Sequence, residues 1–374
     1  MSLVNGVERR SLVKEILRHL PLADKTAVWG TLGTIRPHLN FEVEKDVHAL
    51  LDAVSGKGVE YVTVIDLLTN RSNEQRQQIA EEFLNFTKQD LLKTLEAAFS
   101  GHLEGVITGL LKPAAQFDAH EINLALKGLE ADTLLEILST RTSQQLREIL
   151  GCYKHDFSLD LEKDIASRTS GFLQSLLDAL IKGNRERYSG VIDYVLIRQD
   201  TQALAGPGGG DPGRLDESEW IRILTERSPQ HLNRVFIWYH KKTGLQVEEA
   251  MKKYLEGKAL EAGLTLVSIL RNTPLYFATK LYQAVKGPET SPRTLARILI
   301  SRSETDLLSI RSEFRKHYGI SLYSFLQVRA PGFLYCGWGV GRDGGRKSRG
   351  PGLLHQHHNF GSLPSLNFSI PAGP

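Results

Sequence analysis

Several short patterns in this 374-residue chain have residue types and spacings that could support chemistry. A Gly-x-Gly-x-x-Gly pattern at 339–344 is typical of a dinucleotide-binding turn, but no strand pattern precedes it and no helix pattern follows it. Three histidines at 355–358 could bind zinc, but no fourth ligand is evident beside them. The aromatic run at 236–240 could hold a quaternary ammonium group, although aromatic residues at helical spacing are more typical of a core.

No nucleophile, base and orienting acid can be assembled from the recurring positions, so we predict that the protein is not an enzyme. Lys and Arg total 46 and Asp and Glu total 43, and the net charge of +3 is too small to predict nucleic-acid binding. The basic segment 342–350 could touch RNA or acidic lipid, but we interpret it as a solvated tail. Two cysteines, Cys152 and Cys336, cannot build a disulfide scaffold, which favours a reducing compartment.

The N-terminal arm, 1–39, has no apolar signal core, and no apolar run in the chain reaches the roughly 18–20 residues that span a bilayer. Ser11 precedes apolar residues at helical spacing, which predicts a short amphipathic helix in this arm. That helix either docks on a protein partner or a membrane, or packs on the protein's own core. We therefore expect a cytoplasmic chain that could lie on a membrane without crossing it.

One motif recurs four times: Leu, two residues, Arg, Ser or Thr, two residues, a polar residue, and an apolar residue four positions later. Its arginines lie 70, 86 and 75 residues apart, at Arg71, Arg141, Arg227 and Arg302. This spacing is longer than the ~20–50 residues of common solenoid repeats, so each unit should contain several helices. An inserted Gly/Pro-rich segment at 205–214 helps to explain the longest interval.

The motif predicts a junction between two helices. Its Leu ends one helix, and its Ser or Thr caps the next, with Gln75 and Gln145 placed to complete capping boxes in the first two copies. We expect the arginine to bond the last carbonyls of the preceding helix rather than a ligand.

A second element follows each arginine by about 30 residues: a glycine that opens an apolar helical stretch, at Gly101, Gly171 and Gly257. The fourth copy starts at Gly332 and then fails, because residues 331–374 contain ten Gly and five Pro and no apolar period. The sequence therefore predicts that the fourth unit lacks its closing helix.

These repeats resemble the core of the annexins, most clearly in LLTNRSNEQRQQIAEEF, EILSTRTSQQLREI, ILTERSPQHLNRVF and ILISRSETDLLSIRSEFRK. Segments 19–41 and 153–165 most resemble a divergent member of that family. The resemblance implies an all-α fold of four repeats of about five helices, arranged as a curved disc with an irregular tail. The expected boundaries are an arm at 1–39, repeats at 40–112, 113–195, 196–271 and 272–332, and a Gly/Pro-rich tail at 333–374.

The resemblance also implies calcium-mediated binding to acidic phospholipid. In each annexin repeat a Lys-Gly-x-Gly-Thr loop offers backbone carbonyls, and an Asp or Glu about 40 residues later completes the oxygen set that calcium requires. This chain departs from that pattern. The positions of the four acids are occupied by Ala98, Arg168, Tyr254 and Arg329. Both loop glycines survive in the first repeat alone, as Gly56 and Gly58, and the second loop, 127–131, is about two residues short.

We therefore predict weak or absent calcium binding, with a residual low-affinity ion at Gly56 and Gly58 at most. Arg168 and Arg329 could contact lipid phosphate without calcium, because a guanidinium is planar, always charged and bidentate. The alternative is that both are ordinary solvated arginines in loops that have lost their role.

The function expected from the sequence is peripheral binding to acidic phospholipid, weakly or without calcium. The alternative is a protein-interaction or cell-surface receptor-like module that uses the disc as a scaffold. The expected partners are an acidic membrane surface, a protein at the N-terminal helix, and a second copy of the chain, with no nucleic acid.

Overall fold

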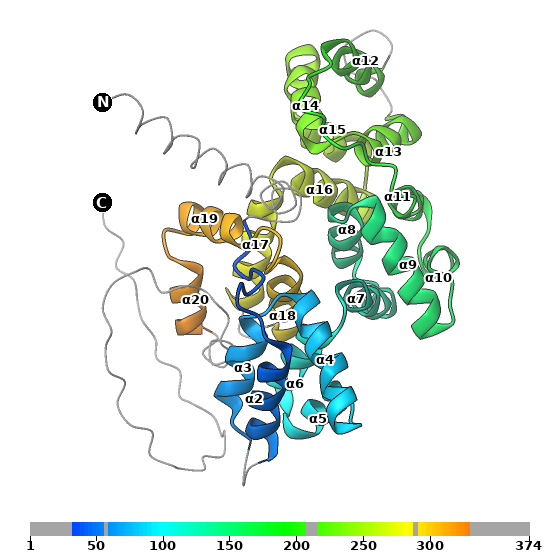
Figure 1. Cartoon of the computed structure of the whole chain (residues 1–374). Coiled ribbons are helices and arrows are strands. Elements are labelled where there is room, and N and C mark those ends of the chain that lie inside the picture. Colours follow the sequence, from blue (N-terminus) through cyan, green and yellow to red (C-terminus); the bar gives the residue numbers. More distant parts are fainter. Residues whose placement is uncertain (1–31, 56–58, 207–214, 287–290, 330–374) are drawn as a thin grey trace, which may run out of the picture. The chain divides into compact units, whose positions relative to one another are not determined.

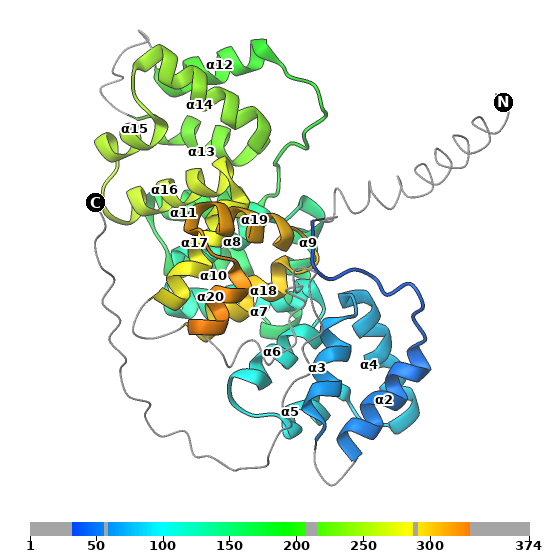
Figure 2. The same ribbon diagram turned by 90° about the vertical axis from the view of Figure 1, so that its left-hand side faces the viewer.

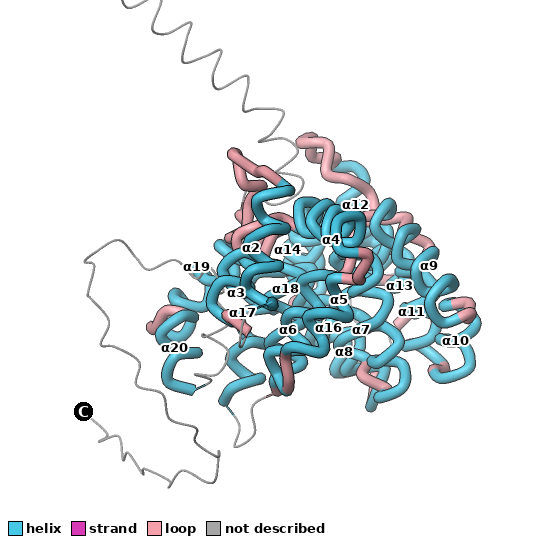
Figure 3. The backbone as a smooth tube through the Cα atoms, turned by 60° about the horizontal axis from the view of Figure 1, so that its bottom comes forward, coloured by secondary structure: helices cyan, strands magenta, loops and turns pink. Residues whose placement is uncertain are grey.

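The computed structural model describes residues 32–55, 59–206, 215–286 and 291–329 (Figure 1). Across these residues the chain forms nineteen helices and no strand, and short loops join most of the helices (Figure 3). The predicted all-α fold of four repeats is confirmed. The predicted N-terminal helix, Gly56, Gly58, the pattern at 339–344 and the histidines at 355–358 lie outside the described residues. No described helix is long and apolar enough to cross a membrane.

Each of the first three repeats contains five helices. Repeat one contains α2 (Val43–Ser55), α3 (Tyr61–Thr69), α4 (Asn73–Thr87), α5 (Leu91–Ala98) and α6 (Gly101–Leu111). Repeat two contains α7 (Ala114–Gly128), α8 (Ala131–Thr140), α9 (Ser143–Phe157), α10 (Leu161–Arg168) and α11 (Gly171–Ile181). Repeat three contains α12 (Tyr194–Ala205), α13 (Glu217–Glu226), α14 (Pro229–Thr243), α15 (Val247–Tyr254) and α16 (Gly257–Arg271).

Repeat four has four described helices: α17 (Thr273–Lys286), α18 (Pro292–Arg302), α19 (Leu307–Tyr318) and α20 (Leu322–Arg329). In every repeat the first helix packs against the third, and Figure 2 shows this neighbour relation for α2 with α4 and for α12 with α14. The closing helices pack across repeats, α6 on α18, α11 on α13 and α16 on α8, so their apolar faces help to form one continuous core.

The predicted capping junctions are present in three of the four motif copies. Ser72 and Thr142 cap α4 and α9, and in both cases the Gln three residues later closes a capping box. Ser228 accepts a hydrogen bond from the backbone N–H of His231 at the start of α14. The prediction is wrong for the fourth copy. There the Ser303 hydroxyl donates back to the Ile300 carbonyl, and α19 begins only at Leu307.

The motif arginines are structural, as predicted, but their main partners differ from those predicted. Arg71 binds Asp46 with two hydrogen bonds of 2.5 and 2.8 Å, and Arg141 binds Asp118 in the same way at 2.6 and 2.9 Å. The predicted carbonyl contact is present for Arg71, whose Nη1 donates to the Asn70 carbonyl at 3.1 Å. Each aspartate lies on the first helix of its repeat. The pair therefore links that helix to the junction between the second and third helices.

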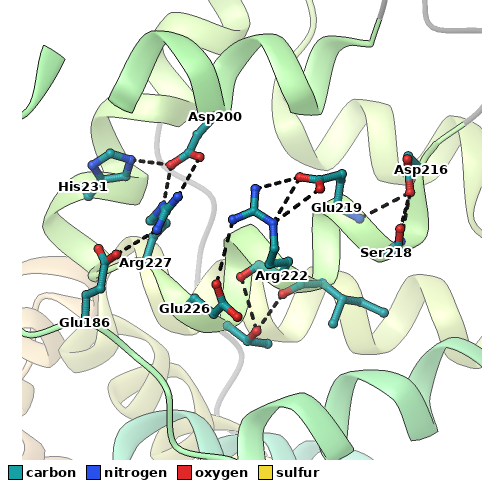
Figure 4. Close-up of polar contacts among 11 residues, drawn as sticks. Glu186, Asp200, Asp216, Ser218, Glu219, Arg222, Glu226, Arg227 and His231 are labelled. Carbon is teal, nitrogen blue, oxygen red and sulfur yellow. Dashed lines mark hydrogen bonds and ion pairs between the residues drawn. The ribbon is translucent and has the colours of Figure 1, made fainter. Parts of the chain in front are cut away.

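Repeat three adds a histidine to this arrangement (Figure 4). Arg227 binds Asp200 at 2.7 and 3.2 Å, and a ring nitrogen of His231 lies 2.8 Å from the same carboxylate. Burial raises the pKa of Asp200, but the hydrogen bonds from His231 and Arg227 outweigh it and hold that pKa below its usual value. The carboxylate is therefore charged and fixed.

In repeat four, the aromatic ring of Phe277 takes the place of the aspartate that binds the motif arginine in the other repeats. Arg302 stacks on Phe277 of α17, with its guanidinium carbon 4.6 Å from the ring centroid, and binds Asp306 one turn later instead. Asp306 thus binds Arg302 instead of closing a capping box with Ser303. This different pairing accounts for the later start of α19.

Two aromatic residues of the run at 236–240 form core, as predicted, while Ile237 between them is 54% exposed. Phe236 and Tyr239 are buried, and the Tyr239 ring meets Trp220 edge-on with centroids 5.8 Å apart. The cation on Phe236 is the protein's own Arg271, whose guanidinium carbon lies 5.0 Å from the ring centroid. An external quaternary ammonium group is therefore not needed to explain this cluster.

Thr142→Ala is expected to lower the free energy of unfolding by about 1 kcal/mol, because it removes the side-chain acceptor at the start of α9. Thr142→Ser keeps that oxygen and should lose much less. Urea unfolding of the two variants beside the unchanged protein measures the difference. Equal losses for alanine and serine would show that the methyl group, not the cap, stabilises the junction.

Candidate functional site

The four positions that would carry the calcium-binding acid share one place in the fold. Each is the last residue of the eight-residue fourth helix of its repeat: Ala98 on α5, Arg168 on α10, Tyr254 on α15 and Arg329 on α20. In the first three repeats a glycine three residues later has a φ of 66°, 60° or 52° and opens the closing helix. Positive φ favours glycine, so the turn is preserved although the carboxylate is not.

In repeat one the position offers no ligand atom. The Ala98 side chain is a methyl group, and the adjacent Phe99 is buried and packs edge-on against Tyr61, with ring centroids 5.0 Å apart. Val62 beside Tyr61 is 73% exposed. The Ala98 position itself therefore offers calcium no carboxylate.

In repeat two the position holds a cation that is fixed by its own helix. The Nε atom of Arg168 donates to Asp164 at 2.7 Å, and Asp164 also accepts from the Tyr153 hydroxyl at 2.5 Å. Burial raises the pKa of Asp164, but these two hydrogen bonds prevail and lower it. The Arg168 side chain remains 38% exposed, and no described residue binds its two Nη nitrogens. They are available to an anion.

The one carboxylate in the α7–α8 loop is already occupied. Glu130 accepts hydrogen bonds from Thr133 at 3.1 Å and from Arg293 at 2.8 Å. The loop is tight: Leu129 has a φ of 54°, its carbonyl accepts from the N–H of Ala131, and the N–H of Glu130 binds the Ala125 carbonyl. The Glu130 carboxylate and the Leu129 carbonyl are therefore both engaged within the described protein.

The equivalent positions of repeats three and four also hold no carboxylate. Tyr254 is half-buried, and its hydroxyl has no partner among the described residues, while Lys253 lies 5.2 Å from its ring centroid. Arg329 is exposed at the end of α20. Across the described ranges, no three His, Cys, Asp or Glu side chains come together in a way that could hold a metal ion.

A cavity of about 710 Å³ lies beside the two loops of repeat two. Arg168 and Glu130 line it together with Lys258 of α16 and Lys280 of α17. Sequence reasoning did not single out these lysines, because their approach depends on packing between repeats. Lys280 is paired with Asp132, whose other oxygen accepts from Thr265 at 3.0 Å.

A buried ion pair at the edge of this cavity was also missed. Arg297 of α18 donates to Glu136 of α8, and burial would lower the pKa of Arg297, but the Glu136 and Glu121 carboxylates raise it. A signal was available, because Glu136 and Arg297 occupy the same position of the motif, two residues before its Leu.

Comparisons of the sequence and of the structure with known proteins both identify annexins. The sequence model of the Annexin family matches residues 45–110, 117–180, 212–266 and 276–334. Human annexin A9 is 53% identical over 334 residues, which cover 89% of this chain and 96% of that protein. The structure of annexin III has a TM-score of 0.78 at 36% identity, covering 83% of this chain and 98% of that one. Chicken annexin V has a TM-score of 0.71 at 36% identity, over 83% and 99%.

The chain therefore belongs to the annexin family, as its helical repeats and helix-end turns already indicated. The family's fold is one of calcium- and phospholipid-binding proteins. In this member, the fourth helices of the four repeats end in Ala98, Arg168, Tyr254 and Arg329, none of which is a carboxylate.

Proposed function

We propose that this annexin is a non-enzymatic, peripheral phospholipid-binding protein whose type II calcium sites are degenerate. Binding to acidic membranes would then be weak or independent of calcium. The observation that carries the proposal is the identity of the four residues that end α5, α10, α15 and α20, none of which is a carboxylate. Calcium requires six to eight oxygen ligands, and the missing bidentate acid removes two of them and a full charge.

We further propose that Arg168 and Arg329 bind lipid phosphate in place of a calcium bridge. Arg168 has its Nε held by Asp164, so its planar group is oriented before lipid arrives. Arg329 is exposed at the equivalent end of α20. Each basic residue at an anionic surface contributes about 1 kcal/mol.

The double variant Arg168→Glu/Arg329→Glu is expected to lower binding to phosphatidylserine vesicles in chelator by at least roughly tenfold. Co-sedimentation at physiological salt measures this loss. Arg147→Glu/Arg198→Glu, which reverses two exposed arginines on α9 and α12, is the charge-matched control and should bind nearly as the unchanged protein does. Equal binding by all three proteins would remove the two arginines from the proposal.

The same assay addresses the alternative role. No sedimentation with or without calcium would favour a protein-interaction scaffold, with partners at the N-terminal helix or a second copy. This proposal also includes a cytoplasmic location at membranes and a likeness to the divergent annexin called pemphaxin. The proposed repeat boundaries are 40–112, 113–195, 196–271 and 272–332. The family-matched segments and the 53% identity to annexin A9 support it.

A further inference from the structure

A second cavity, of about 300 Å³, lies away from the helix-end turns discussed above. It is lined by the linker 183–187 between repeats two and three, by the first turn of α9 and by Pro229 at the start of α14. The linker runs tightly along α9. Ser143 donates to the Gly183 carbonyl, and a Cβ on Gly183 would lie 3.3 Å from the Cα of Ser143.

Arg185 in this linker is a partly buried cation with an incomplete set of partners. Its Nη1 donates to the Arg227 carbonyl at 2.6 Å, whereas its Nη2 is buried and has no partner among the described residues. Burial lowers the pKa of Arg185 to about 10, and no carboxylate opposes that shift. The two acids that line the cavity are engaged elsewhere, Glu186 by Arg227 and Asp306 by Arg302.

At the start of α4, a helix N-terminus and a nearby arginine do have an acidic partner. There the backbone N–H of Asn73 donates to a Glu304 oxygen at 2.6 Å, and Arg76 donates to the same oxygen at 3.2 Å. Glu304 comes from repeat four, where it directly follows the motif serine. A helix start and a buried arginine thus share one carboxylate, as the positive end of a helix dipole favours.

The start of α9 has the helix and the arginine without the carboxylate. The residue that follows the motif serine in repeat three is Pro229, and it lines the cavity together with Ser143 and Arg185. Proline has no acceptor in its side chain, so neither the first turn of α9 nor Arg185 receives an anion from the described protein. The unfilled volume lies where the acidic side chain would otherwise be.

We propose that this cavity is an anion site for a phosphate group, held by Arg185 and the first turn of α9 in the role that Glu304 has at α4. The volume of about 300 Å³ admits a free phosphate or the phosphate of a lipid headgroup. The site depends on neither the calcium loops nor Arg168 and Arg329.

The test is a titration of the full chain with inorganic phosphate at constant ionic strength, followed by thermal unfolding and calorimetry. The unchanged protein should show a saturable rise in Tm, because a ligand that binds only the folded state stabilises it. Arg185→Met keeps the length of the side chain and should weaken phosphate binding at least about tenfold. Arg198→Met, which removes an exposed arginine of α12 that does not line the cavity, should change it little.

A second variant does not depend on how well Arg185→Met folds. Pro229→Glu supplies the carboxylate that repeat four has, so it should raise Tm without phosphate and abolish the phosphate-dependent rise. Absence of a saturable rise in the unchanged protein, or an equal rise in Arg185→Met and Pro229→Glu, would overturn the proposal.

The source of the phosphate is identified by a parallel arm with phosphatidylserine vesicles in chelator. If Arg185→Met binds phosphate weakly but binds vesicles normally, the ligand is soluble. If both are weakened, and free phosphate competes with vesicles in the unchanged protein, the ligand is a lipid headgroup.

Discussion

Replacing Asp118 with alanine is expected to lower the free energy of unfolding by about 3–5 kcal/mol, because it leaves Arg141 charged and buried without its partner. The side chains of Arg141 and Asp118 are only 7% and 8% exposed, and two hydrogen bonds join them. Truncating one member of such a pair costs far more than the pair contributes over an apolar replacement.

Chemical denaturation of Asp118→Ala measures this loss, and Glu219→Ala is the matched control. Glu219 binds Arg222 on the surface of α13, with both side chains more than a third exposed, so its removal should cost less than about 1 kcal/mol. A loss of that small size for Asp118→Ala as well would contradict the view that the arginine–aspartate pairs fix the helix junctions.

Ala98→Glu is expected to create calcium-dependent membrane binding in a protein that otherwise has little. It restores a carboxylate at the end of α5, in the one repeat whose loop keeps both glycines, Gly56 and Gly58. A bidentate carboxylate supplies two oxygens and a charge to an ion that needs both. Phosphatidylserine vesicles should sediment at least about tenfold more of this variant with calcium than with chelator.

Two variants control for the added charge. Ala97→Glu adds the same group one residue earlier on an exposed face of α5, and it should leave calcium dependence unchanged. Arg168→Glu restores an acid in repeat two, where the loop is short and Glu130 is occupied, and it should also fail to create a site. Calcium dependence in all three variants would show that charge alone, not the loop geometry of repeat one, governs binding.

Much of the fold follows from local signals in the sequence. A Ser or Thr followed three residues later by Gln places the starts of α4 and α9, and Gly101, Gly171 and Gly257 place the starts of the closing helices. These signals suffice because each acts within one turn. Repeat four departs from these signals because Phe277 stands where the other repeats have the aspartate that binds the motif arginine. Arg302 binds Asp306 instead, and Asp306 does not cap the next helix.

Longer-range features were not predictable in the same way. The spacing between Asp46 and Arg71 differs from that between Asp118 and Arg141, so no fixed interval marks the pairs. The approach of Lys280 to Asp132 depends on how repeats two and four pack. By contrast, the bond between Asp164 and Arg168 spans four residues of one helix, and this spacing could have been used to predict that Arg168 is anchored.

The proposed function depends on the absence of a carboxylate at the ends of α5, α10, α15 and α20. Titration calorimetry of the unchanged protein with calcium, without membranes, tests it most directly. We expect no saturable heat at micromolar calcium. Tight uptake of one or more ions per chain would contradict the proposed function, because other oxygen ligands would then hold calcium without a carboxylate at these four helix ends.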